Sequence, residues 1–282
     1  METADILKAF ETVDGVYKHC EVDEALKQQK TITPHLIEIL KKVLVNPGSF
    51  ARGESDDYAH IYAVMLLGYF REAAAHETIV RLFSFPGELP HVIFGDIVTE
   101  ELNNILYRTA NGKIDLIKSM ILDTKVNEYC RAAAIESLVF FVVYEEIERE
   151  EVTRFLDSLF DLLYKEEFVS ELLFTSSATA AHNIFPEELM DKVDEAYEEG
   201  CIASFFVCRG DFDTALKDGK KKVLEQTKSR LENRYPEDFH DWMSSWSCFK
   251  ADNRITGTGS KILYTAGEKN KQKRARKKRK KK

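Results

Sequence analysis

The middle of the chain repeats one pattern four times, in which an apolar helical segment is followed by a more highly charged one. The first segments begin near residues 58, 96, 129 and 168, so the repeat period is 32 to 40 residues. A period of that length built from two helices is typical of an α-solenoid. One helix pair cannot cover its own apolar face, so neighbouring pairs must stack and share a continuous core.

The expected pairs are residues 58–70 with 76–85, 96–107 with 113–122, 129–143 with 151–163, and 168–185 with 187–197. A further pair, residues 4–17 and 34–45, precedes them, with Thr33 as the expected N-cap and Pro34 at the first helical position. After these pairs the pattern is less regular: residues 201–208 are a helix or a buried extended segment, of which we favour the helix, and residues 213–231 are expected to be a long helix. The pattern therefore predicts an all-α fold.

An aromatic stripe follows near the C-terminal end. Its members are Tyr235, Phe239, Trp242, Trp246 and Phe249, which are spaced by 4, 3, 4 and 3 residues and so share one face of a helix. Such a stripe can dock a partner in a helix-in-groove manner. It can also cover the open end of the stack, because a terminal repeat has no neighbour to bury its apolar face. We favour the covering role, and we predict a C-terminal helical cap.

The composition supports a helical fold. Only 13 Gly and 6 Pro occur among 282 residues, which argues against an all-β sandwich or barrel with many turns. No window approaches 18 apolar residues without a charge, so no membrane span is expected. Glu2 and Asp5 lie where a secretory signal carries basic residues, and no such signal is expected.

Charge is distributed very unevenly. The last 22 residues contain 12 of the 40 Lys and Arg residues and one of the 48 Asp and Glu residues, which gives +11 there and −19 over residues 1–260. An acidic body repels nucleic acid, whereas a basic tail attracts phosphate or acidic protein. We expect a solenoid over residues 1–250, a linker over 251–267, and a disordered polybasic tail over 268–282.

The tail is the main candidate binding element. Its candidate contact residues are Lys271, Lys273, Arg274, Arg276, Lys277, Lys278, Arg279, Lys280, Lys281 and Lys282. Such runs match nucleic-acid-binding segments and nuclear-import signals alike. Binding to phosphates would depend steeply on salt, and the lack of aromatics beyond Tyr264 predicts no base stacking or sequence readout. The tail could also fold back on the acidic body.

The helix pairs resemble HEAT-type repeats. The small residues Ala132, Ala133 and Ala134, preceded by Arg131 and followed by Leu138, permit close helix approach behind a basic helix start. The resemblance implies stacked HEAT-like helix pairs.

The order and content of residues 32–34, 58–72 and 95–100 also resemble a bacterial family catalogued as domain of unknown function 1186, over about residues 30–250. That family has no established activity, so the resemblance implies a fold and little function. Its members often end in a cysteine-rich SEC-C zinc motif. Residues 252–261 contain no cysteine, so a polybasic tail takes the place of that motif and no zinc is expected.

Catalytic signatures are absent from the sequence: it has no complete phosphate loop, Rossmann fingerprint, HExxH motif or nucleophile elbow. The best acid–base cluster is His91 with Asp96, Glu100 and Glu101, of which Asp96 and Glu100 lie on one helix face at i and i+4. Helix capping and the helix dipole explain these acids more simply. We therefore predict no catalytic residue, no metal ligand and no cofactor, and interpret the remaining histidines as packing or surface residues.

Two other groups of residues suggest structural roles. The acidic run from Glu145 to Glu151 lacks the alternation of a calcium loop and is expected to be a solvated loop and helix start. The five cysteines are far apart and are interpreted as free thiols in a reducing compartment.

Three functional hypotheses remain. The first is a non-enzymatic scaffold that binds a protein or peptide on the solenoid surface and nucleic acid through the tail, in the cytoplasm. The second is a targeted protein whose tail is a nuclear-import signal, either a eukaryotic protein or a bacterial effector that acts in the nucleus of a host cell. The third is a hydrolytic or metal-dependent enzyme that uses the cluster at His91.

Overall fold

A computed structural model describes residues 1–12, 14–51, 58–235 and 237–244, and it confirms the all-α fold class. Within these residues it contains seventeen α-helices, two 3-10 helices (η1 and η2) and one isolated β-bridge between Pro86 and Val126.

The helices of the first half are α1 (Thr3–Phe10), α2 (His19–Lys27), α3 (Gln29–Val45), α4 (Pro47–Ala51), α5 (Ala59–Tyr69), η1 (Ala73–Ala75), α6 (His76–Phe83), α7 (Leu89–Phe94), α8 (Ile97–Glu100) and α9 (Leu102–Ala110). Those of the second half are α10 (Asp115–Leu122), α11 (Glu128–Val143), α12 (Arg149–Leu163), α13 (Glu171–Asn183), η2 (Glu187–Leu189), α14 (Met190–Glu198), α15 (Arg209–Asp218), α16 (Lys220–Arg234) and α17 (Phe239–Met243).

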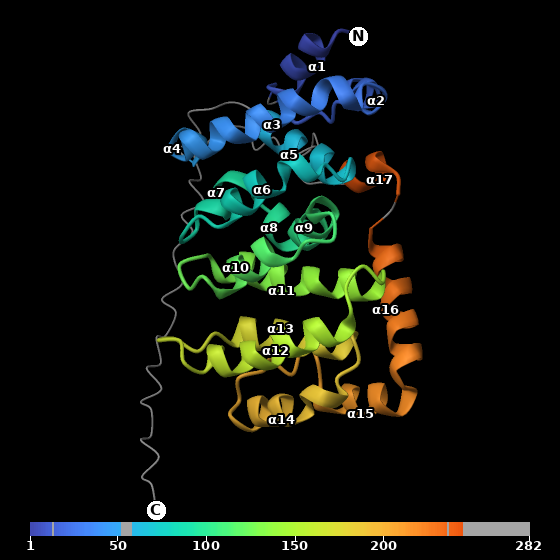
Figure 1. The fold of residues 1–282 in the computed structure, drawn as a ribbon. Coiled ribbons are helices and arrows are strands. Elements are labelled where there is room, and N and C mark those ends of the chain that lie inside the picture. Colours follow the sequence, from blue (N-terminus) through green and yellow to red (C-terminus); the bar gives the residue numbers. More distant parts are fainter. Residues whose placement is uncertain (13, 52–57, 236, 245–282) are drawn as a thin grey trace, which may run out of the picture.

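Five helices form an inner row, in which each contacts the next: α3, α5, α9, α11 and α13. Helices α6, α10 and α12 pack beside this row, so that α6 contacts α3 and α9 while α12 contacts α11 and α13. Figure 1 shows the resulting layers, which follow the chain order from the N-terminal helices to α14. Helices that are neighbours in sequence are therefore neighbours in space over most of the stack.

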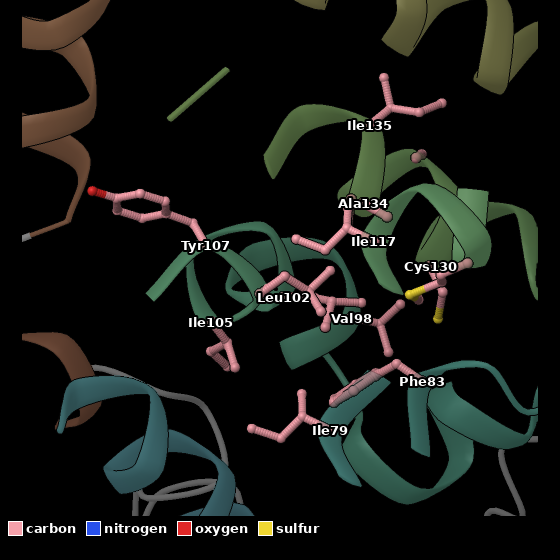
Figure 2. Close-up of a cluster of buried hydrophobic side chains, with 14 of the residues drawn as sticks. Ile79, Phe83, Val98, Leu102, Ile105, Tyr107, Ile117, Cys130, Ala134 and Ile135 are labelled. Carbon is pink, nitrogen blue, oxygen red and sulfur yellow. The ribbon is translucent and has the colours of Figure 1, made fainter. Parts of the chain in front are cut away.

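The inner row is buried because its helices are apolar on nearly every side. All ten residues from Ala59 to Gly68 of α5 are buried, and so are 13 of the 16 residues of α11. A helix that is apolar all round cannot face water on any side. In one layer of the core, side chains of α6, α8, α9, α10 and α11 converge (Figure 2): Ile79, Phe83, Val98, Leu102, Ile105, Ile117, Cys130 and Ala134. Where α5 meets α9, the glycine at position 68 allows this close approach, because an added Cβ would lie 3.1 Å from Cγ1 of Ile105.

Two buried arginines fasten neighbouring layers together. Arg131 in the first turn of α11 donates to the carbonyl of Ile121 at the end of α10 (2.7 Å) and to both carboxylate oxygens of Glu166. Arg149 at the start of α12 donates to the carbonyl of Ile184 (2.6 Å) and also pairs with Glu188. A guanidinium at a helix end satisfies carbonyls that the helix itself leaves unpaired.

The N-terminal boundary predicted for the second helix is wrong. Helix α3 begins at Gln29 and contains Pro34 in its interior, where Thr33 is buried instead of capping the helix. Only Gln28 separates α2 from α3, so the helix starts before the proline. Pro34 has no N–H to donate to the carbonyl of Lys30, four residues earlier, so one intrahelical hydrogen bond is lost there.

Further boundaries differ from the prediction. The expected helix over residues 4–17 already ends at Phe10, and a separate helix that was not predicted, α2, follows it. The expected helix over residues 96–107 is broken at Glu101, whose backbone has φ −124°. Residues 201–208 are not helical, because Gly200 (φ +64°) ends α14 and the chain then turns to place Ala203 against the hydroxyl of Thr175. The expected helix over 213–231 is two helices, separated at Gly219.

Candidate functional site: a C-terminal strap across the stack

A strap formed by α16 and α17 crosses the layers of the stack and returns to its N-terminal end (Figure 1). It begins at Gly219, whose φ of +79° lies in the left-handed region and ends α15. Helix α16 then contacts α11, α13 and α15. Helix α16 of the strap therefore lies along one side of several successive layers.

Few apolar residues hold α16 in place. Val223 and Thr227 are buried, and Val223 packs with Phe185 and Ala215 in a small cluster separate from the main core. Exposed basic residues on α16 form ion pairs with acids of the stack: Lys220 lies 3.5 Å from Glu150. Charge attraction thus supplements a narrow apolar seam.

The end of α16 is anchored by a chain of buried polar groups. The Tyr235 hydroxyl donates to Oδ1 of Asn103 (2.8 Å), and Nδ2 of Asn103 donates to the carboxylate of Glu136 (3.2 Å). Burial raises the pKa of Glu136, while Arg234 and the two hydrogen bonds from Asn103 and Ser176 oppose that rise. These contacts place two residues of α9 and α11 directly beneath the strap.

The side chains of Trp242 and Phe239 hold helix α17 against the stack. The indole N–H of Trp242 donates to Glu101, the residue that interrupts α8 and α9. Burial raises the pKa of Glu101 to about 7, and this rise outweighs the opposing effects of the Trp242 hydrogen bond and of Arg234. The guanidinium of Arg108 lies over the Trp242 ring at 5.4 Å, a cation–π contact.

At the tip of the strap, His240 contacts the N-terminal helices. Its Nδ1 is hydrogen-bonded to the hydroxyl of Tyr17 (2.9 Å) and its Nε2 to Oδ1 of Asp23 (3.1 Å). The His240 ring also stacks on the ring of His19, with centroids 3.8 Å apart and planes 2° from parallel. Both histidines were expected to be packing or surface residues without a partner spacing, and only the fold brings them together.

The part of the aromatic stripe that the structure describes is buried inside the molecule. Tyr235, Phe239 and Trp242 are 9%, 1% and 4% exposed. They pack along the side of the stack, where Phe239 meets Tyr69 of α5 at a centroid distance of 5.1 Å, and not over its C-terminal end. With the strap in place these three rings offer no surface to a partner. Trp246 and Phe249 lie outside the described residues.

The predicted acid–base cluster is dispersed among other contacts. Nδ1 of His91 lies 4.0 Å from Glu88, and Glu100 lies 3.5 Å from Arg234. Asp96 occupies the predicted N-cap position of α8, but its side chain makes no capping hydrogen bond. The neighbouring Glu101, which the sequence assigned to the helix dipole, is the buried partner of Trp242.

The acidic run over residues 145–151 is partly engaged with the stack. Glu146 accepts a hydrogen bond from the hydroxyl of Tyr107 (2.7 Å), and Glu151 pairs with Lys118 (2.7 Å). The run contains the predicted helix start, because α12 begins at Arg149, but two of its acids contact the stack instead of only facing solvent.

Acidic side chains gather on the outer helices near the C-terminal end of the stack. Exposed acids on η2 and α14 are Glu187, Glu188, Asp191, Glu195 and Glu198. Between α12 and η2 lies an open hollow of about 470 Å³, lined by Glu150, Asp157 and Glu188 together with Arg154. This surface is suited to a positively charged ligand.

The polybasic tail from Lys271 to Lys282 lies outside the described residues. Cys20, Cys130 and Cys208 are free thiols, as predicted. Cys20 and Cys208 are exposed, and Cys130 is buried. In the described part of the chain, no helix combines the length and the apolar character needed to cross a membrane.

Similarity to known proteins extends over most of the chain. An uncharacterised protein of Chlamydia trachomatis is 31% identical over 249 residues, which cover 86% of this chain and 96% of that protein. An uncharacterised protein of Chlamydia muridarum is 32% identical over 217 residues, covering 77% of this chain and 85% of that protein. No protein of known structure matches the chain. The family described as "Protein of unknown function (DUF1186)" matches residues 1–250, and the chain belongs to this family, as the resemblance of residues 32–34, 58–72 and 95–100 predicted.

Proposed function

We propose that the protein is a non-enzymatic binding scaffold whose acidic surface holds a basic protein segment and whose tail binds the backbone of nucleic acid. The observation that carries this proposal is the separation of charge, with −19 over residues 1–260 and +11 over the last 22 residues. Two surfaces of opposite sign select ligands of opposite sign, so one chain can hold both at once.

The acidic surface supports the first half of the proposal. The acids of α14 and η2 are exposed, and Asp191, Glu195 and Glu198 recur along one helix at spacings of four and three residues. Residues at these spacings share a helix face, so the carboxylates form a row that an extended basic segment can follow. The hollow between α12 and η2, which Asp157 also lines, adds a place for one long basic side chain.

The second half rests on the composition of the tail. Its Lys and Arg residues can neutralise several phosphates, and release of the counterions held by those phosphates makes the affinity fall as salt rises. Without aromatic residues in residues 265–282 the tail has no platform for base stacking. Binding should therefore depend on charge and ignore base sequence.

Fluorescence anisotropy tests the tail. The full-length protein and a chain ending at Gly267 are titrated with labelled duplex DNA and structured RNA at several salt concentrations. We expect only the full-length protein to bind, with an affinity that falls at least tenfold between about 50 and 200 mM salt. Equal binding by the two chains, or none by either, would overturn the nucleic-acid half of the proposal.

A labelled Lys/Arg-rich peptide tests the acidic surface separately, with the chain ending at Gly267 so that the tail cannot compete. Neutralising Asp191, Glu195 and Glu198 to Asn or Gln should weaken peptide binding at least fivefold. The matched control neutralises Glu2, Asp5 and Glu11, exposed acids at the other end of the stack, and should retain wild-type affinity. Equal weakening by both triple variants would point to net charge alone.

A second candidate function is supported by the run from Lys273 to Lys280, which fits an import signal as well as a phosphate contact. Residues 269–282 fused to a fluorescent protein would then accumulate in nuclei. Even distribution of that fusion between nucleus and cytoplasm would exclude this role.

A further inference from the structure

Two imidazoles and one carboxylate from opposite ends of the chain converge at the tip of the strap. His19 begins α2, Asp23 follows one turn later, and His240 is the second residue of α17. One donor atom from each lies within 4.8 Å of the other two. Nδ1 of His19 is 3.3 Å from Oδ2 of Asp23, and Nε2 of His240 is 3.1 Å from Oδ1 of the same carboxylate.

These separations suit a small transition-metal ion. Zinc binds His nitrogens at about 2.0–2.1 Å and carboxylate oxygens at about 2.0–2.2 Å in a tetrahedron, so neighbouring donor atoms lie roughly 3.3–3.4 Å apart. The two measured donor separations at Asp23 are close to that value. The three donors also have the chemistry that divalent zinc favours, two imidazole nitrogens and one anionic oxygen.

The surroundings hold His240 in an orientation that suits metal binding. Its Nδ1 faces the hydroxyl of Tyr17 at 2.9 Å, so the tautomer that carries the proton on Nδ1 presents the Nε2 lone pair to the cluster. Metal-binding histidines are commonly fixed in this way through their second nitrogen. On the other side, the Asp238 carboxylate accepts from the backbone N–H of His240 (2.7 Å) and so fixes the start of α17.

The position of the cluster gives an ion a structural role. His19 and Asp23 belong to the N-terminal helices and His240 belongs to the strap, so one ion bound by all three would link the two ends of the chain. Two of the three donors are at most half exposed, with side-chain exposures of 45% for Asp23 and 18% for His240, whereas His19 is the most accessible at 59%. The rings of His19 and His240 lie in parallel planes in this structure, so an ion bound by both requires the His19 ring to turn out of the stack. Because His19 is largely exposed, this turn admits the ion without opening the core.

We propose that His19, Asp23 and His240 bind a divalent transition-metal ion, for which Zn²⁺ is the best match, and that this ion latches the strap to the N-terminal helices. The fourth position of the ion is open to water. This inference is independent of the charged surfaces on which the proposed function rests, because none of its residues belongs to them.

The same contacts also describe a cluster held by hydrogen bonds alone, with Asp23 accepting from both rings. The two arrangements differ in a measurable way, since only the metal site takes up one ion per chain. Calorimetric titration of the chelator-treated full-length protein with zinc chloride separates them. We expect one Zn²⁺ per chain, together with slower hydrogen exchange of the α17 amides and a higher thermal midpoint once zinc is present.

Four variants locate the site. His19→Ala, Asp23→Asn and His240→Ala should each weaken zinc binding at least tenfold, and Tyr17→Phe should weaken it by about tenfold through the loss of the supporting hydroxyl. Because the side chain of His19 is largely exposed, His19→Ala keeps the fold intact, and its circular dichroism spectrum checks this.

Two control variants complete the design. His35→Ala removes an exposed histidine of α3, and Cys20→Ser removes the exposed thiol beside His19; both should keep wild-type zinc affinity. The proposal is overturned if the wild-type protein binds no zinc, or if His19→Ala and His240→Ala bind it as tightly as wild type does.

Discussion

The indole N–H of Trp242 donates a hydrogen bond to the carboxylate of Glu101, and this contact joins residues that are 141 positions apart. Glu101 interrupts the helical segment that leads into α9, and Trp242 lies near the end of the described chain. Glu101 therefore has two roles. It interrupts the helical segment of the repeat, and its carboxylate binds Trp242 of α17.

This contact predicts an unusual dependence of stability on pH. Burial raises the pKa of Glu101 from 4.5 to about 7, so the folded state binds more protons than the unfolded state between these values. The contribution to stability is fully present below about pH 4.5 and is lost as the pH rises to about 7. Glu101→Gln should reduce that loss and stabilise the protein at pH 8 by on the order of 2 kcal/mol, measured by urea unfolding at pH 5 and pH 8.

The burial of Glu136 raises its pKa too, so Glu101→Gln should reduce the slope without abolishing it. Glu77→Gln is the control, because Glu77 is an exposed glutamate that is not among the groups acting on Glu101, and the pH dependence of this variant should equal that of wild type. An unchanged slope in Glu101→Gln would contradict the assignment.

A second prediction concerns His76, which is buried and hydrogen-bonded to the hydroxyl of Thr109 (2.9 Å). Burial lowers the pKa of His76 from 6.5 to about 4. Its contribution to stability is present above pH 6.5 and is lost as the pH falls toward 4, because the unfolded state takes up the proton first. His76→Asn should flatten this acid limb in unfolding experiments, whereas the exposed control His35→Asn should not.

The buried guanidinium of Arg131 should be far more important for stability than an exposed one. Arg131→Met leaves the Ile121 carbonyl and the Glu166 carboxylate without their partner, which we expect to lower the free energy of unfolding by about 3–5 kcal/mol. Arg154→Met on the exposed face of α12 should change it by less than about 0.5 kcal/mol. Chemical denaturation measures both, and similar losses in the two variants would count against the fastening role of Arg131.

Two glycines test the close contact between α5 and α9. Gly68→Ala places a Cβ 3.1 Å from the fully buried Ile105, so overpacking should exceed the gain in helix propensity and lower stability by about 1 kcal/mol. Gly210→Ala lies in α15, where an added Cβ meets nothing within 4 Å, and should raise stability by about 0.5 kcal/mol. Thermal midpoints that move in the same direction for both would refute this interpretation.

Removal of the Trp242 ring should loosen the strap. Trp242→Ala deletes a side chain that is 4% exposed, and we expect a loss of about 3 kcal/mol together with faster hydrogen exchange in α17 and around Glu101. Ser244→Ala, an exposed change one residue beyond α17, is the control. Exchange that stays slow at Glu101 in the Trp242 variant would show that the strap is held elsewhere.

The repeating helices could be predicted from sequence because their information is local. An apolar run such as residues 59–68 can only be a buried helix, and its boundaries were predicted within one residue at each end. The same reasoning failed at Pro34, because α3 begins at Gln29, directly after α2, and runs through the proline. It also failed at Gly219, where one glycine separates two segments that both have helical patterns. Helix propensity and capping patterns describe a residue within its own segment. They do not say where the preceding segment ends.

The candidate sites depended on information that is not local. The stripe from Tyr235 to Trp242 was recognised as one apolar face, but its pattern could not say which surface that face would meet. His240 and Asp23 are 217 positions apart, and no spacing rule connects them. Only the direction taken by α16 after Gly219 brings them together.

The return of the strap to the N-terminal helices also has a consequence for how the chain is made. An open stack of repeats can assemble layer by layer as each pair leaves the ribosome, since every pair needs only its neighbour. Here the contacts of Tyr17, Asp23 and Glu101 wait for residues that are synthesised more than a hundred positions later. The first helices to emerge are thus among the last to complete their contacts. In a chain whose synthesis stops before α17, the N-terminal helices lack the contacts that α17 makes with them.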